Sequence, residues 1–483
     1  MDQRVAGRRA WLGGVLVLVL ILSGCASAVL DGRPVSMLYD PQRAGGLPAR
    51  DGPSGPRPDA PPPVSVAENS DGGPVDELVL RAVDDLEDFW SQNWEGALTG
   101  TYSPVSRLVS YDASDPASPT VCGNDLYDLS NAFYCFGEDV MAWDRGQFIP
   151  GAAQYFGDMG VVGVIAHEFG HAVQAKAHLV EKSTPVLVKE QQADCFAGVY
   201  LHWVAAGKSP RFDLSTGDGL NHVLAGAIYI RDPLMTQEEA ILTGDAHGSA
   251  LDRISAFQIG FAGNADQCAA IDMAEITGRQ GDLPKFLSYD SYGDPSASDS
   301  PIDEQLLSGL MDTLTQIYQP ASPPSLNLDM APCPDAQTVS PASYCPSTNT
   351  VNVNLPTLQA LGTPKAEDQG VLLQGDNTAL SIVTSRYALA LQKERGDPLD
   401  TAITALRTAC LTGVAQGRMA EPGGTLTLSA GDTDEAISGL LTNGLAASDV
   451  NGVTAPAGFT RILAYRSGLG GDAETCYQRF GAS

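Results

Sequence analysis

The sequence predicts a mainly helical α+β protein, built from two related halves and stapled by disulfide bonds. Three observations predict this. Helical stripes of apolar residues alternate with only a few short strand-like runs, a series of segments before residue 290 recurs in the same order after residue 301, and eight cysteines follow the N-terminal region. At 483 residues the chain is long enough for two or three domains, each with a sizeable core.

Residues 1–25 have the composition of a bacterial lipoprotein signal peptide. Three arginines precede the apolar run WLGGVLVLVLIL, which is shorter than the about 20 residues that a membrane span needs. LSGC, which ends at Cys25, resembles the lipobox, in which the cysteine is lipidated. We therefore expect an exported protein that a lipid on Cys25 anchors at the extracytoplasmic face of a cell membrane. A cleaved signal peptide without lipid and an uncleaved anchor are the alternatives.

Composition also divides the rest of the chain. Residues 26–74 are rich in Gly, Pro, Asp and Ser without an apolar period, which predicts a flexible tether. A helical stripe begins near residue 75 and opens a first domain over residues 75–290. The Ser/Pro/Asp-rich stretch at residues 291–303 separates it from a second domain over residues 301–483. Further helices are predicted in the first domain over residues 158–179, 189–207, 236–244 and 250–264. The run GEDVMAWD predicts a strand. This strand could bind an extended peptide by edge addition.

Six segments of the second domain match segments of the first in the same order. PIDEQLLSGLMDTLTQIYQ is an amphipathic helix like the first one, and CPDAQTVSPASYC matches CGNDLYDLSNAFYC. SIVTSRYALALQ matches VIAHEFGHAVQ, TACLTGV matches ADCFAGV, and GDTDEAISG resembles MTQEEAILTG. RILAYRSGLGGDAETC lies on RISAFQIGFAGNADQC without a gap. The sequence therefore predicts an internal duplication.

The duplication restricts how the cysteines pair. An even number of cysteines in an exported chain indicates disulfide bonds, and eight can pair in many ways. Two short-range pairs would close similar loops in the two halves, which leaves two longer-range pairs. The expected bonds are Cys122–Cys135, Cys333–Cys345, Cys195–Cys268 and Cys410–Cys476.

The charge balance excludes one class of partner. The chain has 58 acidic and 28 basic residues, a formal net charge of -30. Phosphate binding needs basic patches, so we expect no nucleic-acid partner. The acidity is typical of a solvated surface that keeps an exported protein soluble.

The stretch GVIAHEFGHAVQ, residues 163–174, predicts a metal site. Positions four apart on an α-helix are about 40° apart around the axis and about 6 Å along it, so His167 and His171 could share one Zn²⁺ ion. Glu168 points about 100° away, close enough to hold a metal-activated water without ligating the ion. Gly170 would let another element approach this helix.

A catalytic zinc site usually has three protein ligands. The metzincin positions for a third histidine hold other residues, and His178 lies too far along the helix to share the ion. Glu190 and Asp194, in EQQAD, share one face of the next predicted helix. Their spacing resembles the gluzincin arrangement, which implies that Glu190 is the third ligand and that Asp194 supports a histidine from behind. The reverse assignment is the alternative.

The motifs taken together resemble those of the bacterial putative neutral zinc metallopeptidase family. HEFGHAVQ, KEQQADCFAGVY and EEAILTGDAHGSALDR with a late cysteine carry the resemblance, and the CG…FYC segment fits it. It covers roughly residues 75–270. The resemblance implies a gluzincin-like fold and a zinc-dependent peptidase that acts on a peptide or protein substrate.

The second copy lacks the chemistry of the first. The alignment places Ser385, Arg386, Leu389, Ala405 and Ala409 on the five residues His167, Glu168, His171, Glu190 and Asp194. The second domain is therefore predicted to be a degenerate, non-catalytic repeat, and a candidate for binding another envelope protein. Gln174 and Arg253 are retained as Gln392 and Arg461, which predicts structural roles for both.

His247 is lost in the second copy, where Ala455 takes its position. We expect His247 to stabilise the oxyanion of the tetrahedral intermediate, with a solvent-exposed histidine as the alternative. The hypothesis for the whole chain is hydrolysis of peptide bonds by metal-activated water with Glu168 as general base. The competing hypothesis is a non-catalytic, zinc-containing scaffold or binding lipoprotein of the envelope.

Overall fold

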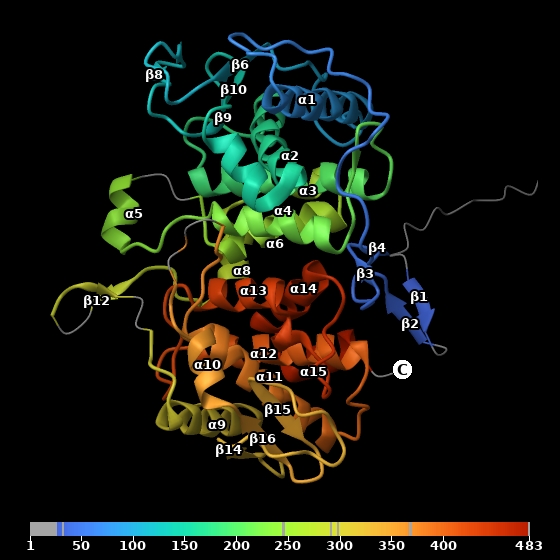
Figure 1. Ribbon diagram of the computed structural model, residues 1–483, viewed down its shortest axis with the longest axis vertical. Coiled ribbons are helices and arrows are strands. Elements are labelled where there is room, and N and C mark those ends of the chain that lie inside the picture. Colours follow the sequence, from blue (N-terminus) through green and yellow to red (C-terminus); the bar gives the residue numbers. More distant parts are fainter. Residues whose placement is uncertain are drawn as a thin grey trace, which may run out of the picture.

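The computed structural model places the two halves of the chain end to end along the long axis of the molecule (Figure 1). A small sheet lies at each end, and helices fill the space between the two sheets. The structure describes residues 27–30, 33–243, 247–289, 292–296, 299–365, 367 and 370–481. The predicted signal peptide and Cys25 lie outside these residues. None of the helices in the described ranges is both long and apolar enough to cross a membrane.

The first half contains a three-stranded sheet with the order β6-β10-β9. The central strand β10 is parallel to β6 and antiparallel to β9. Helix α2 contacts β9 and β10 and also packs against α1, α3 and α4, and α3 packs against α6. The bounds are β6 (Arg107–Tyr111), β9 (Ala132–Cys135), β10 (Val140–Asp144), α1 (Pro74–Asn93), α2 (Phe148–Lys176), α3 (Val186–Ala205), α4 (Asp218–Tyr229), α5 (Gln237–Thr243), α6 (Ala250–Ala262), α7 (Ala265–Ala269) and α8 (Met273–Gln280).

The second half has a sheet with the order β14-β16-β15, again with one parallel and one antiparallel pairing. Helix α11 packs against α12, and α12 packs against α14. The bounds are β14 (Ser325–Asn327), β15 (Ala342–Cys345), β16 (Thr350–Val353), α9 (Glu304–Tyr318), α10 (Leu355–Leu361), α11 (Asp376–Glu394), α12 (Ala402–Met419), α13 (Asp432–Thr442), α14 (Gly458–Leu469) and α15 (Ala473–Arg479).

One helix of the first half was not predicted. The segment Asp218–Tyr229 lies between the helices predicted over residues 189–207 and 236–244, and it forms α4, which buries Leu220, Val223, Leu224 and Ile228 at helical spacing. The segment GDTDEAISG, which was matched with MTQEEAILTG, forms the start of α13. Helix α13 packs against α11 and α14 as α4 packs against α2 and α6, whereas α5 exposes its apolar side chains. The contacts of α13 therefore resemble those of α4 more than those of α5.

The expected flexible tether over residues 26–74 is wrong for most of that segment. Residues Gly55–Pro56 form strand β5, which pairs with β11 (Phe212–Asp213). Further along, the Val64 N–H donates to Asp84 (2.6 Å), and the backbone of Glu68 pairs with that of β6. The segment runs along the surface in irregular extended form, so backbone pairing holds it in place without an apolar period.

The four disulfide bonds pair as predicted. They join Cys122 to Cys135, Cys195 to Cys268, Cys333 to Cys345 and Cys410 to Cys476. The second bond ties α3 to α7, and the fourth ties α12 to α15. Each half therefore carries one short-range and one longer-range bond, and neither half is linked to the other by a disulfide among the described residues.

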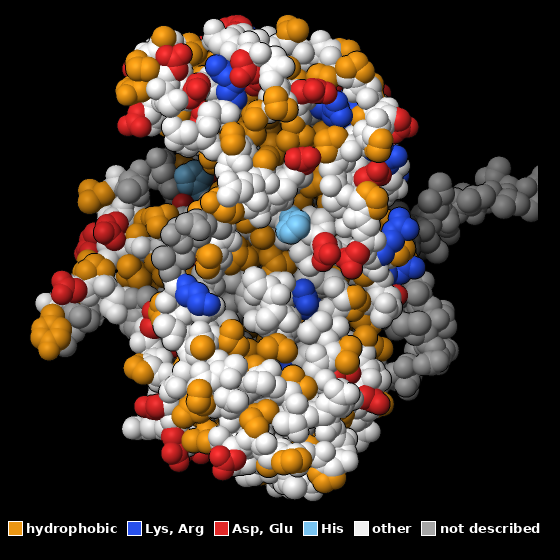
Figure 2. Space-filling model, viewed as in Figure 1, with side chains coloured by type: hydrophobic (Ala, Val, Ile, Leu, Met, Phe, Trp, Pro, Cys, Tyr) orange, Lys and Arg blue, Asp and Glu red, His pale blue; other side chains and the backbone are white. Residues whose placement is uncertain are grey.

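The halves share one apolar core. Helices α4 and α6 of the first half pack against α13 and α14 of the second, and one cluster of buried side chains runs through both halves. The buried Asp434 on α13 accepts hydrogen bonds from the N–H groups of Ala250 and Leu251, at the start of α6 (3.1 Å each). Acidic side chains are spread over both halves on the face that Figure 2 shows.

Two glycines on α3 and α6 allow these helices to touch. A Cβ atom on Gly260 would lie 1.8 Å from the carbonyl oxygen of Cys195, and a Cβ on Gly198 would lie 2.3 Å from that of Phe257. The same contact recurs between α12 and α14, where a Cβ on Gly468 would lie 1.9 Å from the carbonyl oxygen of Cys410. Only glycine fits at these crossings.

Replacing Gly260 with alanine is expected to lower the free energy of unfolding by about 3 kcal/mol, because α6 must move away from α3. The exposed Gly309 on α9 has open space around its Cα, so Gly309→Ala is the matched control and should be neutral or slightly stabilising. Chemical denaturation of both variants measures the difference. Equal stabilities would show that the crossing is not tightly packed.

Candidate metal centre

The candidate site lies where α2 and α3 cross. His167 and His171 are one turn apart on α2, and Glu190 is on α3. The crossing is close at Gly170, where a Cβ atom would lie 2.7 Å from the Cα of Ala193. The expectation that Gly170 admits a neighbouring element is therefore confirmed, and this contact brings Glu190 to the two imidazoles.

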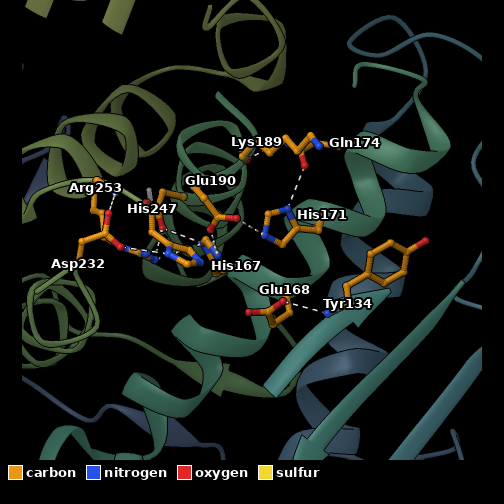
Figure 3. Close-up of polar contacts among 12 residues, drawn as sticks. Tyr134, His167, Glu168, His171, Gln174, Lys189, Glu190, Asp232, His247 and Arg253 are labelled. Atoms are coloured by element: carbon orange, nitrogen blue, oxygen red, sulfur yellow. Dashed lines mark hydrogen bonds and ion pairs between the residues drawn. The ribbon is translucent and has the colours of Figure 1, made fainter. Parts of the chain in front are cut away.

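The three side chains point at one another (Figure 3). Glu190 places one carboxylate oxygen 3.2 Å from Nε2 of His167 and the other 3.4 Å from Nε2 of His171. All three residues are buried, with at most 8 % of their surface exposed. Ligand atoms about 2.0–2.1 Å from a tetrahedral zinc ion are about 3.3 Å apart, so these separations are those of a zinc site.

The outward-facing nitrogens of both imidazoles are already engaged. Nδ1 of His167 lies 2.8 Å from the carboxylate of Asp194, which also accepts a hydrogen bond from Arg253 (2.9 Å). Nδ1 of His171 lies 3.0 Å from the side-chain oxygen of Gln174. Both Nε2 atoms thus remain for a metal, and two imidazoles with one carboxylate are a donor set that zinc prefers. The residues present therefore fit a zinc ion.

The electrostatics of the site favour positive charge at His167. Burial lowers the pKa of His167, but the carboxylates of Asp194 and Glu190 outweigh burial and raise it to about 10. Burial also acts against the charged form of Glu190, yet hydrogen bonds with His167 and His171 hold its pKa well below the usual range. Glu190 is therefore ionised at neutral pH, as a metal ligand must be.

Glu168 follows His167 on α2, and its side chain faces the sheet (Figure 3). Its Oε2 accepts a hydrogen bond from the backbone N–H of Tyr134, on strand β9 (3.0 Å). Burial raises the pKa of Glu168 above its ordinary value. A carboxylate with a raised pKa at the edge of a metal site has the properties of a general base.

His247 lies beside His167 and Glu190 (Figure 3). It follows residues 244–246, which lie outside the described part of the chain, and its side chain is 44 % exposed. Nδ1 lies 3.1 Å from the carboxylate of Asp232, and this hydrogen bond raises the pKa of His247. The structure thus brings His247 to the site, with Nε2 pointing away from Asp232.

Some residues of the site were assigned differently or not at all. Gln174 and Arg253 were predicted to be structural, because the second half retains them, but both contact the side chains that face the metal position. Asp232 and Tyr134 were not singled out. Tyr134 acts through its backbone, which no side-chain motif could reveal, whereas the acidic Asp232 gave no signal because its partner is 15 residues away.

Replacing Gln174 with alanine is expected to weaken zinc binding about 10–100-fold, because His171 loses the group that orients it. Gln174 also donates to the carbonyl of Lys189 (2.6 Å), which steadies the start of α3 next to Glu190. Competition with a coloured chelator measures the affinity. Gln392→Ala, at the matching position of the second half, should leave zinc affinity unchanged.

Comparisons with known proteins agree with the site. The sequence profile of the family described as "Putative neutral zinc metallopeptidase" matches residues 13–271. The uncharacterized protein YpfJ of Escherichia coli K12 is 31% identical over 226 residues, which cover 42% of this chain and 73% of YpfJ. The uncharacterized proteins Mb2605 of Mycobacterium bovis and Rv2575 of Mycobacterium tuberculosis are each 25% identical over 203 residues, covering 38% of this chain and 67% of the relative.

No solved structure matches the chain significantly. The profile spans more than half of the chain and includes both imidazoles and the carboxylate that faces them. The chain belongs to the putative neutral zinc metallopeptidase family.

Proposed function

We propose that the protein is a peptidase that hydrolyses peptide bonds with one zinc ion held by His167, His171 and Glu190. The observation that carries the proposal is the convergence of both Nε2 atoms on the Glu190 carboxylate, with the unused carboxylate of Glu168 on the adjoining face of the same helix. A closed structural site would favour four protein ligands, commonly cysteines. Here three donors converge, and the neighbouring Cys195 is in a disulfide bond.

In the proposed hydrolysis, the metal and each residue of the site have separate roles. Zinc, when bound, supplies a Lewis acid that polarises the substrate carbonyl and lowers the pKa of water. Glu168 takes the proton from the attacking water and passes it to the departing amine. His247, whose raised pKa favours the imidazolium form, directs an Nε2–H donor toward the oxyanion. Asp232 holds the His247 ring in that orientation.

The edge of the small sheet offers a place for the substrate backbone. The strand GEDVMAWD was expected to bind an extended peptide, but β10 lies between β6 and β9 and has no free edge. Strands β6 and β9 are at the edges, and β6 is bridged by Glu68, whereas on the outer side of β9 the Tyr134 N–H reaches Glu168. Backbone groups on that side can pair with an extended peptide and hold its carbonyl near the two histidines.

We also propose that the second half is a degenerate copy of the first. The sheets have the same strand order and pairing directions, the disulfides are equivalent, and the glycine contacts at the two helix crossings match. At the position of Glu168, Arg386 is fully buried and donates to the backbone carbonyls of Leu445 and Asp449. The second half thus keeps the helix packing but fills the site with structural contacts.

The sequence of residues 1–25 supports a proposal about where the protein is located in the cell. We propose export and anchoring through a lipid on Cys25, which would hold the peptidase at the extracytoplasmic face of a cell membrane. The backbone pairing of residues 55–68 with the first half would keep the site close to that anchor.

Zinc content and hydrolysis measured on one preparation test the proposal. We expect one zinc per chain, cleavage of an unstructured protein or a quenched peptide library, loss of cleavage with a chelator and its return with added zinc. Stoichiometric zinc with no cleavage of any library would instead support the zinc-containing scaffold.

A further inference from the structure

A second cluster of carboxylates lies in the other half of the molecule, away from the zinc site. Asp376 is the first residue of α11, and Asp432 and Glu435 are in the first turn of α13. Asp299 belongs to the segment that joins the two halves. One carboxylate oxygen each of Asp299, Asp376 and Glu435 lies within 4.8 Å of the others.

Three of these acids, Asp376, Asp432 and Glu435, are buried without a counter-charge among the described residues, whereas Asp299 is exposed. Asp376 and Glu435 are 6 % and 4 % exposed, and no ion pair among the described residues joins Asp376, Asp432 or Glu435 to a Lys, Arg or His. The buried Arg231 pairs with Asp434 and Glu367 instead. Burying several like charges together is unfavourable unless something positive compensates them.

The hydrogen bonds of Asp376 leave a place for a ligand. Its Oδ2 accepts a hydrogen bond from the Ser300 N–H (2.7 Å), but its buried Oδ1 has no hydrogen-bond partner among the described residues. Asp376 also lines a cavity of about 470 Å³, whose wall includes Asp432 and several hydroxyl groups. An orphaned carboxylate oxygen beside a polar cavity points to a missing cation.

We propose that Asp299, Asp376 and Glu435 bind a divalent cation, namely calcium. The donors are all oxygens, which suit a hard cation and not zinc with its preference for nitrogen and sulfur. Calcium accepts about six to eight oxygens, waters included, in a flexible geometry, whereas magnesium demands near-ideal octahedral coordination. The cavity has room for the waters that complete the coordination of calcium.

Such an ion would join three segments. Asp299 belongs to the connection between the halves, Asp376 begins α11, and Glu435 is on α13, next to the Asp434 that accepts the N–H groups of α6. Binding there would strengthen the junction between the halves. The site and this role are independent of the proposed peptidase activity.

Thermal unfolding of the purified, zinc-loaded protein tests the proposal. Calcium chloride titrated to a saturating level should raise Tm by about 5 °C or more, and calorimetry should show one calcium bound per chain. The His167→Ala variant should show the same calcium response, which separates this site from the zinc centre. No shift and no binding of calcium would overturn the proposal.

Two variants assign the site. Asp376→Asn and Glu435→Gln should each abolish the calcium-dependent shift, while in calcium-free buffer both should melt no lower than the parent because a buried charge is removed. Asp312→Asn, at an exposed position of α9, is the matched control and should keep the shift. A calcium shift that persists in both site variants, or stabilisation by acid alone without any response to calcium, would contradict a cation site.

Discussion

Glu168→Gln is expected to lower peptide hydrolysis by about a thousandfold while the protein stays folded and zinc-loaded. The glutamine keeps the size of the side chain, and its oxygen can still accept the N–H of Tyr134. What it loses is the ability to take a proton from water. Glu168 forms no hydrogen bond or ion pair with Glu190 or with either Nε2 atom, so zinc should remain.

The measurement is kcat for a cleaved peptide together with zinc content. Glu181→Gln, at an exposed position beyond the end of α2, is the matched control and should retain full activity. Loss of zinc from the Glu168 variant would show that this glutamate is a ligand. Undiminished hydrolysis would show that another group is the base.

Glu190→Ala is expected to yield protein with far less than one zinc per chain and no measurable activity. Removing Glu190 takes away one of three donors and leaves the two imidazoles without the carboxylate that faces them. Asp194→Asn should retain stoichiometric zinc at high zinc concentration but bind it about 10–100-fold more weakly, because Asp194 contacts only the outer nitrogen of His167.

Metal analysis after dialysis, followed by competition with a chelator, separates the two effects. The pair of variants decides between the two assignments that the sequence leaves open. If Asp194→Asn were the variant that emerged empty and Glu190→Ala the one that held zinc, the reverse assignment would be right.

The local part of the site could be predicted because it depends on helix geometry alone. Residues four apart on one helix face the same way in any fold, so the pairing of His167 with His171 follows from their spacing. Gly170 marked the crossing at which α3 brings in Glu190. The disulfide pairs could be predicted because the repeated segments restrict which cysteines meet.

Features that depend on long-range contacts could not be predicted. The segment around Gly55 has the composition of a tether, yet its backbone pairs with β11, about 155 residues away. Strand β10 is buried at all of its positions because it lies between β6 and β9, and this strand order depends on pairing with β6, which is distant in the sequence. Helix α4 carries Gly219, Asn221 and Gly226, which weaken the helical signal although its apolar residues have helical spacing.

Residues that are the same in the matched segments of both halves need not have a structural role alone. The match of Gln174 and Arg253 with Gln392 and Arg461 suggested structural roles, but Gln174 contacts His171 itself and Arg253 contacts Asp194, the partner of His167. In the second half, Gln392 contacts Thr408 and Arg407 instead. Under the proposed duplication, a polar residue would thus keep its place in the helix packing while its partners change.

The central claim is that one metal ion lies between two imidazoles on α2 and a carboxylate on α3. Anomalous scattering from crystals of the purified protein, recorded on both sides of the zinc absorption edge, tests it most directly. We predict one strong zinc peak within coordination distance of Nε2 of His167, Nε2 of His171 and the Glu190 carboxylate. A map without a peak at that position, or with Glu190 turned away from an ion held by other residues, would contradict the account.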